Sequence, residues 1–296
     1  LAALVLAACA ATTGRDYLVD YARRPEVAAA FDADAGARGR QLAALLADGP
    51  AWVSPLVARQ SILRLHALPR ALDAFDPAAG IVVDAGSDGR YVMDPLETGE
   101  ARRLLAAWPG MVLDPAPSSL AIGPPTRTRQ ARAPGPEPNP LLVLRLPDAA
   151  ARRLGGPPVD GSPRFGDALR LARAGVSSAV VAPGGTITVA LAFDVLAPTT
   201  RDLSMFVHAL AGNRSVAQLD GPPLGAGAPT DRWRPGSRVL LARGLAVAAD
   251  APSGPVEVRV GLYDWRDGSR LPVEGDDDGA IRIGSFEVGV ANAAPR

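Results

Sequence analysis

The sequence predicts an α+β protein, in which a small α/β layer (parallel and Rossmann-like) precedes an antiparallel β-sandwich. Two observations lead to this prediction. Up to about residue 115, short apolar segments of strand type alternate with helical segments, a pattern typical of parallel α/β sheets. From about residue 165, apolar residues recur at every second position between turns rich in glycine and proline, as they do in sandwiches of antiparallel strands.

Composition sets limits on function before any element is considered. The chain has 296 residues, enough for about two domains. It carries 31 basic and 31 acidic residues, all of the basic ones are arginine, and no basic block stands out, which argues against a nucleic-acid partner. The absence of lysine excludes a P-loop lysine or a Schiff base. With 2 histidines and 1 cysteine we expect no zinc site, and no motif predicts a cofactor.

Residues 1–14 are the first predicted segment, and three interpretations of them remain open. Leu1–Ala11 is apolar and uncharged but shorter than the roughly 20 residues that span a bilayer. It can be the end of a transmembrane helix, or a buried helix. It can also be the end of a signal peptide, because Leu6-Ala7-Ala8-Cys9 has the spacing of a lipoprotein cleavage site with Cys9 as the lipid anchor. The transmembrane and signal-peptide readings place the rest of the chain outside the cytoplasmic membrane.

Residues 15–115 are predicted to be a helical lead-in and the small α/β domain. Residues 15–48 are predicted to be helical from the spacing of their leucines, and further helices follow Ser54-Pro55 and the capping sequence that begins at Asp94. The predicted strands are 51–53, 81–83, 91–93 and 111–113. Alternation of these strands with the helices is the basis for expecting a largely parallel sheet.

The second half of the chain is divided by composition. Residues 116–164 are rich in proline and are predicted to be a semi-rigid linker. Residues 165–290 are predicted to be the β-sandwich, because large apolar residues occupy every second position in runs such as Thr186–Phe193 and Val256–Leu262. Residues 291–296 are a short tail.

No catalytic residue is predicted. Neither His66 nor His208 is accompanied by a nucleophile motif, so both are interpreted as structural. Asp84 and Asp94 follow predicted strands, where active-site carboxylates are common in α/β sheets. A turn accounts for Asp84 and helix capping accounts for Asp94, and we favour these structural interpretations.

Carbohydrate binding is the one ligand chemistry that the sandwich sequence suggests. Aromatic rings beside carboxylates and guanidinium groups can stack on a sugar and hydrogen-bond its hydroxyls. The candidate residues are Asp220, Arg232, Trp233, Tyr263, Asp264 and Trp265. The alternative, which we favour for the loop around Trp233, is a loop held to the sandwich by its own tryptophan with arginines against the ring.

Several segments together resemble one family. They are Phe206-Val207-His208, Gln218–Pro223, Pro229–Gly236, Pro252–Gly254 and Val260–Asp264. These segments resemble the C-terminal β-domain of bacterial family 39-like membrane glycosyltransferases, which have the GT-C type of fold and are akin to protein mannosyltransferases and aminoarabinose transferases. The stretch from Arg15 to Phe31 is similar to the segment after the last membrane helix of those proteins.

The resemblance implies a polytopic enzyme that takes a sugar from a polyprenyl-phosphate carrier on the outer side of the membrane. Its catalytic acidic residues would lie in a membrane region that this sequence does not contain, so the chain is expected to be non-catalytic. The implied location is the extracytoplasmic face of the cell membrane, with attachment through the N-terminal segment and a glycan or polyprenyl-phosphate sugar as a possible partner. The chain would position an acceptor or stabilise the membrane part. The alternative is a cell-surface lipoprotein, anchored through Cys9, whose sandwich binds a glycan or a protein.

Overall fold

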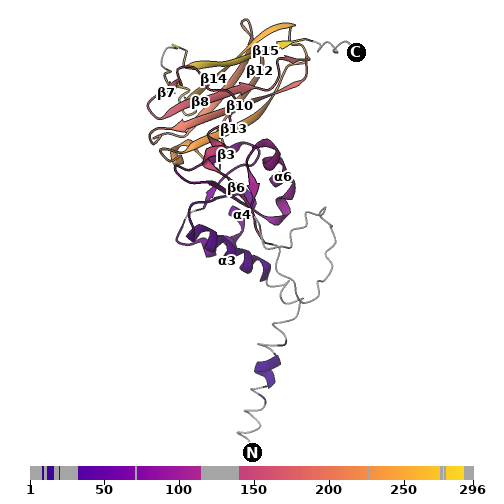
Figure 1. Cartoon of the computed structure of the whole chain (residues 1–296), viewed down its shortest axis with the longest axis vertical. Coiled ribbons are helices and arrows are strands. Elements are labelled where there is room, and N and C mark those ends of the chain that lie inside the picture. The colour runs from indigo at the N-terminus through magenta and orange to yellow at the C-terminus, as the bar shows by residue number, and fades with distance from the viewer. Residues whose placement is uncertain are drawn as a thin grey trace, which may run out of the picture.

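The computed structural model describes residues 9, 12–16, 20, 33–70, 72–114, 140–225, 227–273, 276 and 278–289. It has 40% strand and 22% helix in three mostly antiparallel sheets, so the protein is mainly β. In Figure 1 the helices gather around one sheet, and the other two sheets lie beyond them. Most of the N-terminal segment, the proline-rich patch 134–139 and the tail 291–296 lie outside the described residues.

Several helices form where capping residues predict them, but the short helices at 148–151 and 230–232 are not predicted from the sequence, and the helix Ala33–Ala47 covers only part of the helix predicted over 15–48. Their bounds are α3 Ala33–Ala47, α4 Pro55–Arg59, α5 Ser61–Ala67, η2 Pro95–Glu97, α6 Thr98–Ala107, α7 Asp148–Ala151 and η3 Thr230–Arg232. Ser54 caps α4 by accepting a hydrogen bond from the Val57 amide at 3.3 Å. Asp94 and Glu97 form the predicted capping box at η2.

The first sheet, sheet A, is mixed rather than largely parallel. Its strand order is β2-β1-β4-β6-β5. The bounds are β1 Trp52–Val53, β2 Asp73–Ala74, β4 Gly89–Met93, β5 Val112–Leu113 and β6 Leu142–Leu146. β1 runs parallel to β2 and β4, whereas β6 is antiparallel to β4 and β5.

The predicted linker is too long, because its second half belongs to the fold. β6 and α7 both fall within residues 116–164. The apolar residues of β6 are buried, and its backbone pairs with β4 over five positions. The sequence prediction missed this strand because the residues around it are rich in proline.

The second sheet, sheet B, recruits a strand from the N-terminal half. Its order is β3-β13-β10-β8-β7. The bounds are β3 Gly80–Val83, β7 Arg164–Phe165, β8 Leu169–Val176, β10 Thr186–Val195 and β13 Arg238–Ala246. The strand predicted at 81–83 forms, but it pairs with β13 instead of joining sheet A. Gly80 permits this pairing, since a Cβ there would collide with the Leu240 carbonyl oxygen.

The third sheet, sheet C, contains the longest strand of the described chain. Its order is β12-β11-β14-β15-β9. The bounds are β9 Val180–Val181, β11 Leu203–Ala211, β12 Arg214–Gly221, β14 Gly254–Asp264 and β15 Ala280–Val288. All of its pairs are antiparallel except that between β15 and β9.

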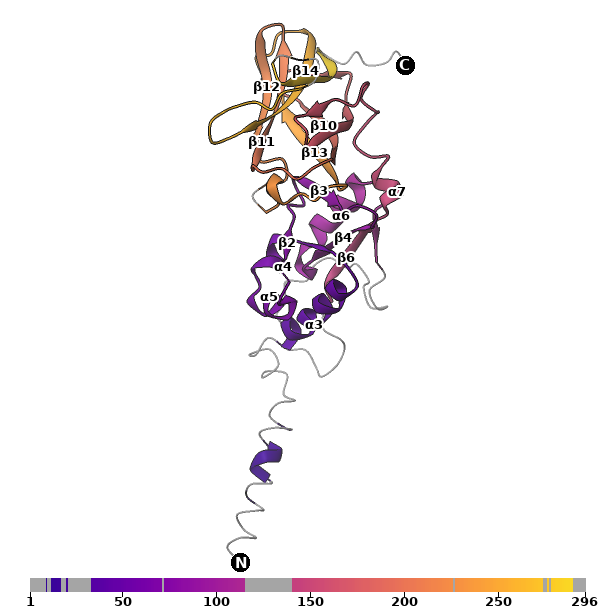
Figure 2. The ribbon, with the colours of Figure 1, turned by 90° about the vertical axis from the view of Figure 1, so that its left-hand side faces the viewer.

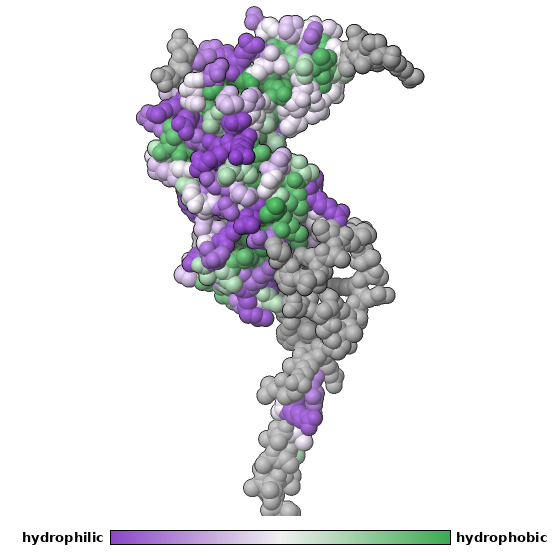
Figure 3. All heavy atoms as spheres, viewed as in Figure 1, coloured by the Kyte–Doolittle hydropathy of each residue, from purple (hydrophilic) through white to green (hydrophobic). Residues whose placement is uncertain are grey.

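One hydrophobic cluster runs through all three sheets. It includes Trp52 and Tyr91 of sheet A, Phe193 of sheet B and Val260 of sheet C. A smaller cluster lies between α3, α5 and the opposite face of sheet A, around Leu42 and other buried residues. On the face seen in Figure 3, hydrophobic residues form patches among hydrophilic ones over both the helical part and the sheets.

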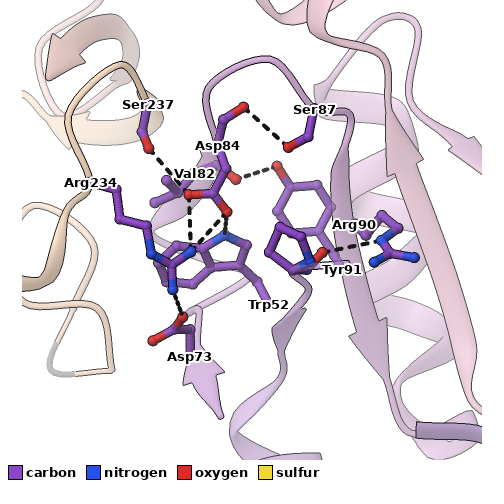
Figure 4. Close-up of polar contacts among 10 residues, drawn as sticks. Trp52, Asp73, Val82, Asp84, Ser87, Arg90, Tyr91, Arg234 and Ser237 are labelled. Carbon is purple, nitrogen blue, oxygen red and sulfur yellow. Dashed lines mark hydrogen bonds and ion pairs between the residues drawn. The ribbon is translucent and has the colours of Figure 1, made fainter. Parts of the chain in front are cut away.

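Asp84 ties the helical part to sheet B. It follows β3, is 8% exposed, and accepts hydrogen bonds from Trp52 Nε1 at 3.3 Å and Ser237 Oγ at 3.2 Å. Arg234 Nη1 lies 3.2 Å and 3.3 Å from its two carboxylate oxygens, and Nη2 of the same guanidinium contacts Asp73 at 2.5 Å. Figure 4 shows Trp52, Arg234 and Ser237 converging on the Asp84 carboxylate, while Asp73 contacts the other side of the guanidinium. Asp84 is therefore structural, as the sequence indicates, though with more partners than a turn residue needs.

Candidate functional site

The outer face of sheet C carries a group of aromatic and polar side chains. Alternation along β11 places Met205, Val207 and Ala209 in the hydrophobic cluster, so Phe206 and His208 point to the other face. In the register of β11 with β14, Tyr263 of β14 pairs with Ser204 of β11. We call Phe206, His208, Asp220, Tyr263 and Arg270 the aromatic platform.

Close contacts hold the aromatic platform together. The Tyr263 hydroxyl donates a short hydrogen bond to Oδ1 of Asp220 on the far side of β11. The ring of Phe206 lies 4.8 Å from that of His208 and 6.3 Å from that of Tyr263, measured between centroids. The Arg270 guanidinium carbon lies 4.7 Å from the Phe206 ring centroid, a cation–π arrangement.

Glycine makes room for the central ring of the aromatic platform. Phe206 pairs with Gly261 across the strands, and a Cβ at Gly261 would collide with the Phe206 ring. The ring therefore covers the glycine backbone and is itself only 4% exposed. Phe206 lies beneath the other members of the platform, whereas Tyr263 is half-buried and Asp220 and Arg270 are exposed to solvent.

Two pKa values within the aromatic platform depart from their usual range. The hydrogen bond to Asp220 raises the pKa of Tyr263, with a further contribution from burial. Burial lowers the pKa of His208, the positive charge of Arg270 lowers it further, and the negative charge of Asp220 opposes both. The net shift favours the neutral form of His208, in which one ring nitrogen can donate a hydrogen bond and the other can accept one.

The other predicted carbohydrate-binding residues are placed elsewhere. Trp233 is 3% exposed and its Nε1 donates to the Ala228 carbonyl at 3.1 Å, so its ring is not free to stack on a sugar. Asp264 is 5% exposed and accepts from Arg201 at 3.4 Å and from the Arg266 amide at 3.0 Å. Trp265 is 55% exposed, with Arg266 over its ring.

The correction at Trp233 has a simple physical reason. The loop around η3 has to close the end of the hydrophobic cluster, and Trp233 is the aromatic that it contributes. Arg232 beside it is exposed. The loop is thus held by its own tryptophan, as the alternative favoured on sequence grounds expects. The arginines expected against that ring are not found there among the described residues, and Arg234 pairs with Asp73 and Asp84.

Three members of the aromatic platform are not among the predicted site residues. The sequence interpretation treats His208 as structural and singles out neither Phe206 nor Arg270 as a ligand contact. Strand alternation gives the faces of Phe206 and His208, so this signal is present in the sequence. Arg270 reaches the platform through the turn after β14, which no periodicity predicts.

A second polar cluster lies at the carboxyl ends of the parallel strands β1 and β4. Asp94 accepts from Gln60 Nε2 at 2.7 Å, and Arg38 Nη1 lies 3.7 Å from the same carboxylate. Glu97 accepts from the Asp94 amide at 2.8 Å and, in a short hydrogen bond, from the Ser54 hydroxyl. Burial raises the pKa of Glu97, although the hydrogen bonds from Ser54 and Asp94 act in the opposite direction. Asp94 and Glu97 are satisfied by these partners and form the capping box, although Nε of Arg38 is buried without a hydrogen-bond partner, so the structural interpretation of Asp94 fits the geometry.

The described residues show neither a metal cluster nor a membrane-spanning helix. Within them, no group of three or more histidine, cysteine, aspartate or glutamate side chains is arranged to hold a metal ion. No helix among them combines the length and apolar character needed to cross a bilayer. Cys9 is exposed and is not in a disulfide.

Comparisons with known proteins give no family. No family model matches the sequence, and no curated protein matches it. Among solved structures, the Pseudomonas fluorescens alkylpurine DNA glycosylase AlkC bound to DNA is 17% identical over 42% of this chain and 31% of that one, with a TM-score of 0.24. AvmM, which catalyses macrocyclization in alchivemycin A biosynthesis, is 15% identical over 47% of this chain and 97% of that one, with a TM-score of 0.23. Likenesses at this level carry no argument about fold or activity.

Proposed function

We propose that this chain is the non-catalytic, extracytoplasmic C-terminal region of a membrane glycosyltransferase that uses a polyprenyl-phosphate-linked sugar. In this proposal sheets B and C form a β-sandwich, and the outer face of sheet C holds the glycan acceptor or the transferred sugar on the aromatic platform. The proposal rests on the sequence motifs of β11, β12 and β14 and on one structural observation.

That observation is the hydrogen bond between Tyr263 and Asp220 on an open sheet face. It fixes a half-exposed aromatic ring next to an exposed carboxylate, with the Arg270 guanidinium nearby. A ring provides a stacking surface for the C–H face of a pyranose, and the charged groups bind its hydroxyls. Phe206 beneath them keeps the arrangement rigid, so little conformational freedom is lost when a sugar binds.

Glycan-array binding followed by calorimetry tests the proposal. Tyr263→Phe keeps the ring but removes the hydroxyl that orients Asp220, and Asp220→Asn keeps the shape but removes the charge. Each is expected to weaken binding of an array-positive glycan by about tenfold, the effect of one lost hydrogen bond to a charged group. Tyr263→Ala is expected to abolish binding by removing the stacking surface.

The matched control is Arg214→Gln on β12, which removes an exposed ion pair with Asp250 in the turn before β14. It should leave glycan affinity unchanged. If no glycan binds the native chain, or if Arg214→Gln weakens binding as much as Asp220→Asn does, the aromatic platform is not a glycan site.

The second candidate is a cell-surface lipoprotein, and the exposed thiol of Cys9 in its lipoprotein-like setting supports it. Immunoblotting of fractionated source cells separates the two. A band far above 30.4 kDa that requires detergent supports the glycosyltransferase region, whereas a band near that mass that takes up a lipid probe supports the lipoprotein.

A further inference from the structure

We propose that the surface formed by α5 and the turn after it docks onto an anionic membrane surface. We call Arg64, Leu65, Leu68, Pro69 and Arg70 the α5 patch. It is separate from the aromatic platform, and the argument for it does not depend on what the platform binds.

The α5 patch exposes apolar side chains that a folded domain normally buries. Leu65 and Leu68 are each 66% exposed. With Ala58 and Leu72 they line an open hollow of about 720 Å³. Transfer of exposed leucine side chains out of water is favourable. The boundary between the headgroups and acyl chains of a bilayer is an apolar environment that side chains on a protein surface can reach.

Charge around the α5 patch favours an anionic partner. The segment 50–72 contains Arg59, Arg64 and Arg70 and no acidic residue. None of these arginines makes an ion pair with a carboxylate among the described residues, and no acidic side chain lines the hollow. Leucines flanked by uncompensated arginines are typical of segments that lie on anionic lipid headgroups.

The position of the α5 patch agrees with this partner. Figure 2 shows α3, α4 and α5 together at the end of the fold that is remote from β11, β12 and β14. α3 is also where the chain enters the fold, and the apolar Leu1–Ala11 precedes it in the sequence. A membrane contact at this end leaves the outer face of sheet C away from the bilayer.

A site-specific fluorophore tests the docking of the α5 patch in the full chain. In a Cys9→Ser background, Ser61→Cys carries an NBD label at the rim of the hollow. Vesicles of phosphatidylcholine with phosphatidylglycerol should shift its emission to the blue, and about 0.5 M salt should reverse most of the shift because the attraction is screened. Vesicles of phosphatidylcholine alone should give little shift.

The matched control carries the label at Ser215→Cys, an exposed position of β12. A label there should not respond, even if Leu1–Ala11 itself holds the chain on vesicles. Vesicle binding without a shift at position 61, or an equal shift at both positions, overturns the proposal. A shift that depends on protein concentration without vesicles identifies a second copy of this chain as the partner and also overturns it.

Paired variants separate the apolar and charged contributions. Arg64→Gln with Arg70→Gln should weaken the partitioning that the label reports by about 30-fold, and Leu65→Ser with Leu68→Ser by at least about tenfold. The controls are Arg102→Gln with Arg153→Gln, which remove the same charge from other exposed positions, and Leu96→Ser, at a leucine that is 83% exposed elsewhere. If these controls reduce the partitioning as much as the patch variants do, net charge and general hydrophobicity explain the binding and the α5 patch does not.

Discussion

Arg234 and Asp84 are 150 residues apart in the sequence, yet Nη1 of the arginine lies 3.2 Å from Oδ1 of the aspartate. Burial of the guanidinium lowers the pKa of Arg234, but the charges of Asp84 and Asp73 and their hydrogen bonds raise it more, so its pKa stays above the usual value. The same Asp84 charge adds to burial in raising the pKa of Tyr91 well above its usual range. The junction between the helical part and sheet B is therefore organised around one negative charge.

Asp84→Ala is expected to lower the free energy of unfolding by about 2–3 kcal/mol, because the buried Trp52 Nε1 and Ser237 hydroxyl lose their acceptor. Urea denaturation measures this loss. Glu100→Ala, which breaks an exposed pair with Arg103, is the control and should change stability by less than about 0.5 kcal/mol. A loss at Asp84 as small as the control's would mean that the junction is held by packing alone.

Trp233→Ala is expected to cost about 3–5 kcal/mol of unfolding free energy, since it empties a buried aromatic site. Trp265→Ala removes a largely exposed ring and should cost less than about 1 kcal/mol. Denaturation midpoints compare the two tryptophans directly. The opposite order would mean that the Trp233 ring is free of the hydrophobic cluster and able to stack on a sugar.

Gly261→Ala is expected to destabilise the chain by about 1–3 kcal/mol, because the new methyl group collides with the Phe206 ring and also with the Gly279 carbonyl oxygen. Combining it with Phe206→Leu, which removes the flat ring, should cost less than the sum of the two single changes. A double-mutant cycle by urea denaturation measures this coupling. Strict additivity would show that Phe206 does not lie over Gly261.

Two variants are expected to shift the pKa of His208 in opposite directions. Arg270→Gln should raise the pKa, since it removes a nearby positive charge, and Asp220→Asn should lower it further. NMR titration of the ring protons measures both. Because the folded-state pKa is below the unfolded value, the contribution of His208 to stability is present above about pH 6.5 and is lost as the pH falls through the folded-state pKa. Shifts of the same sign in both variants would contradict the geometry.

Ionisation of Glu97 should lower the free energy of unfolding as the pH rises. Its pKa is raised, so the favourable contribution of its protonated form is present below the unfolded pKa near 4.5 and is lost as the pH rises through the folded-state pKa. Glu97→Gln mimics the protonated form. Its unfolding free energy relative to the native chain should therefore increase between about pH 4 and pH 7, as urea denaturation across that range will show.

Local elements were largely predictable, whereas their partners were not. The strands at 52–53, 81–83 and 91–93 and the capping box at Asp94 follow from apolar runs and capping residues. The assignment of β3 to sheet B depends on pairing with β13, about 160 residues later, which no local pattern encodes.

In the candidate site, too, the local features could be predicted from the sequence, whereas the tertiary contacts could not. Alternation gives the faces of Phe206 and Tyr263, and the sequence motifs select Asp220 and Tyr263, which the structure brings together. Burial of Trp233 depends on how the loop around η3 closes the sheets, and the position of Arg270 depends on a turn. Both are tertiary consequences that composition and spacing do not carry.

The pairing of β3 with β13 limits where the chain can be divided into stable fragments. A fragment that starts at Pro140 would keep most of sheet B but lose β3, leaving the backbone edge of β13 from Arg238 to Leu241 without its partner. Such an edge pairs readily with other chains, so the fragment should aggregate. A fragment that ends at Asp114 would in turn lose β6, the strand that joins β4 to the edge strand β5 in sheet A. The helical part and sheet B therefore share strands in a way that makes them one folding unit, and we expect neither fragment to be stable alone.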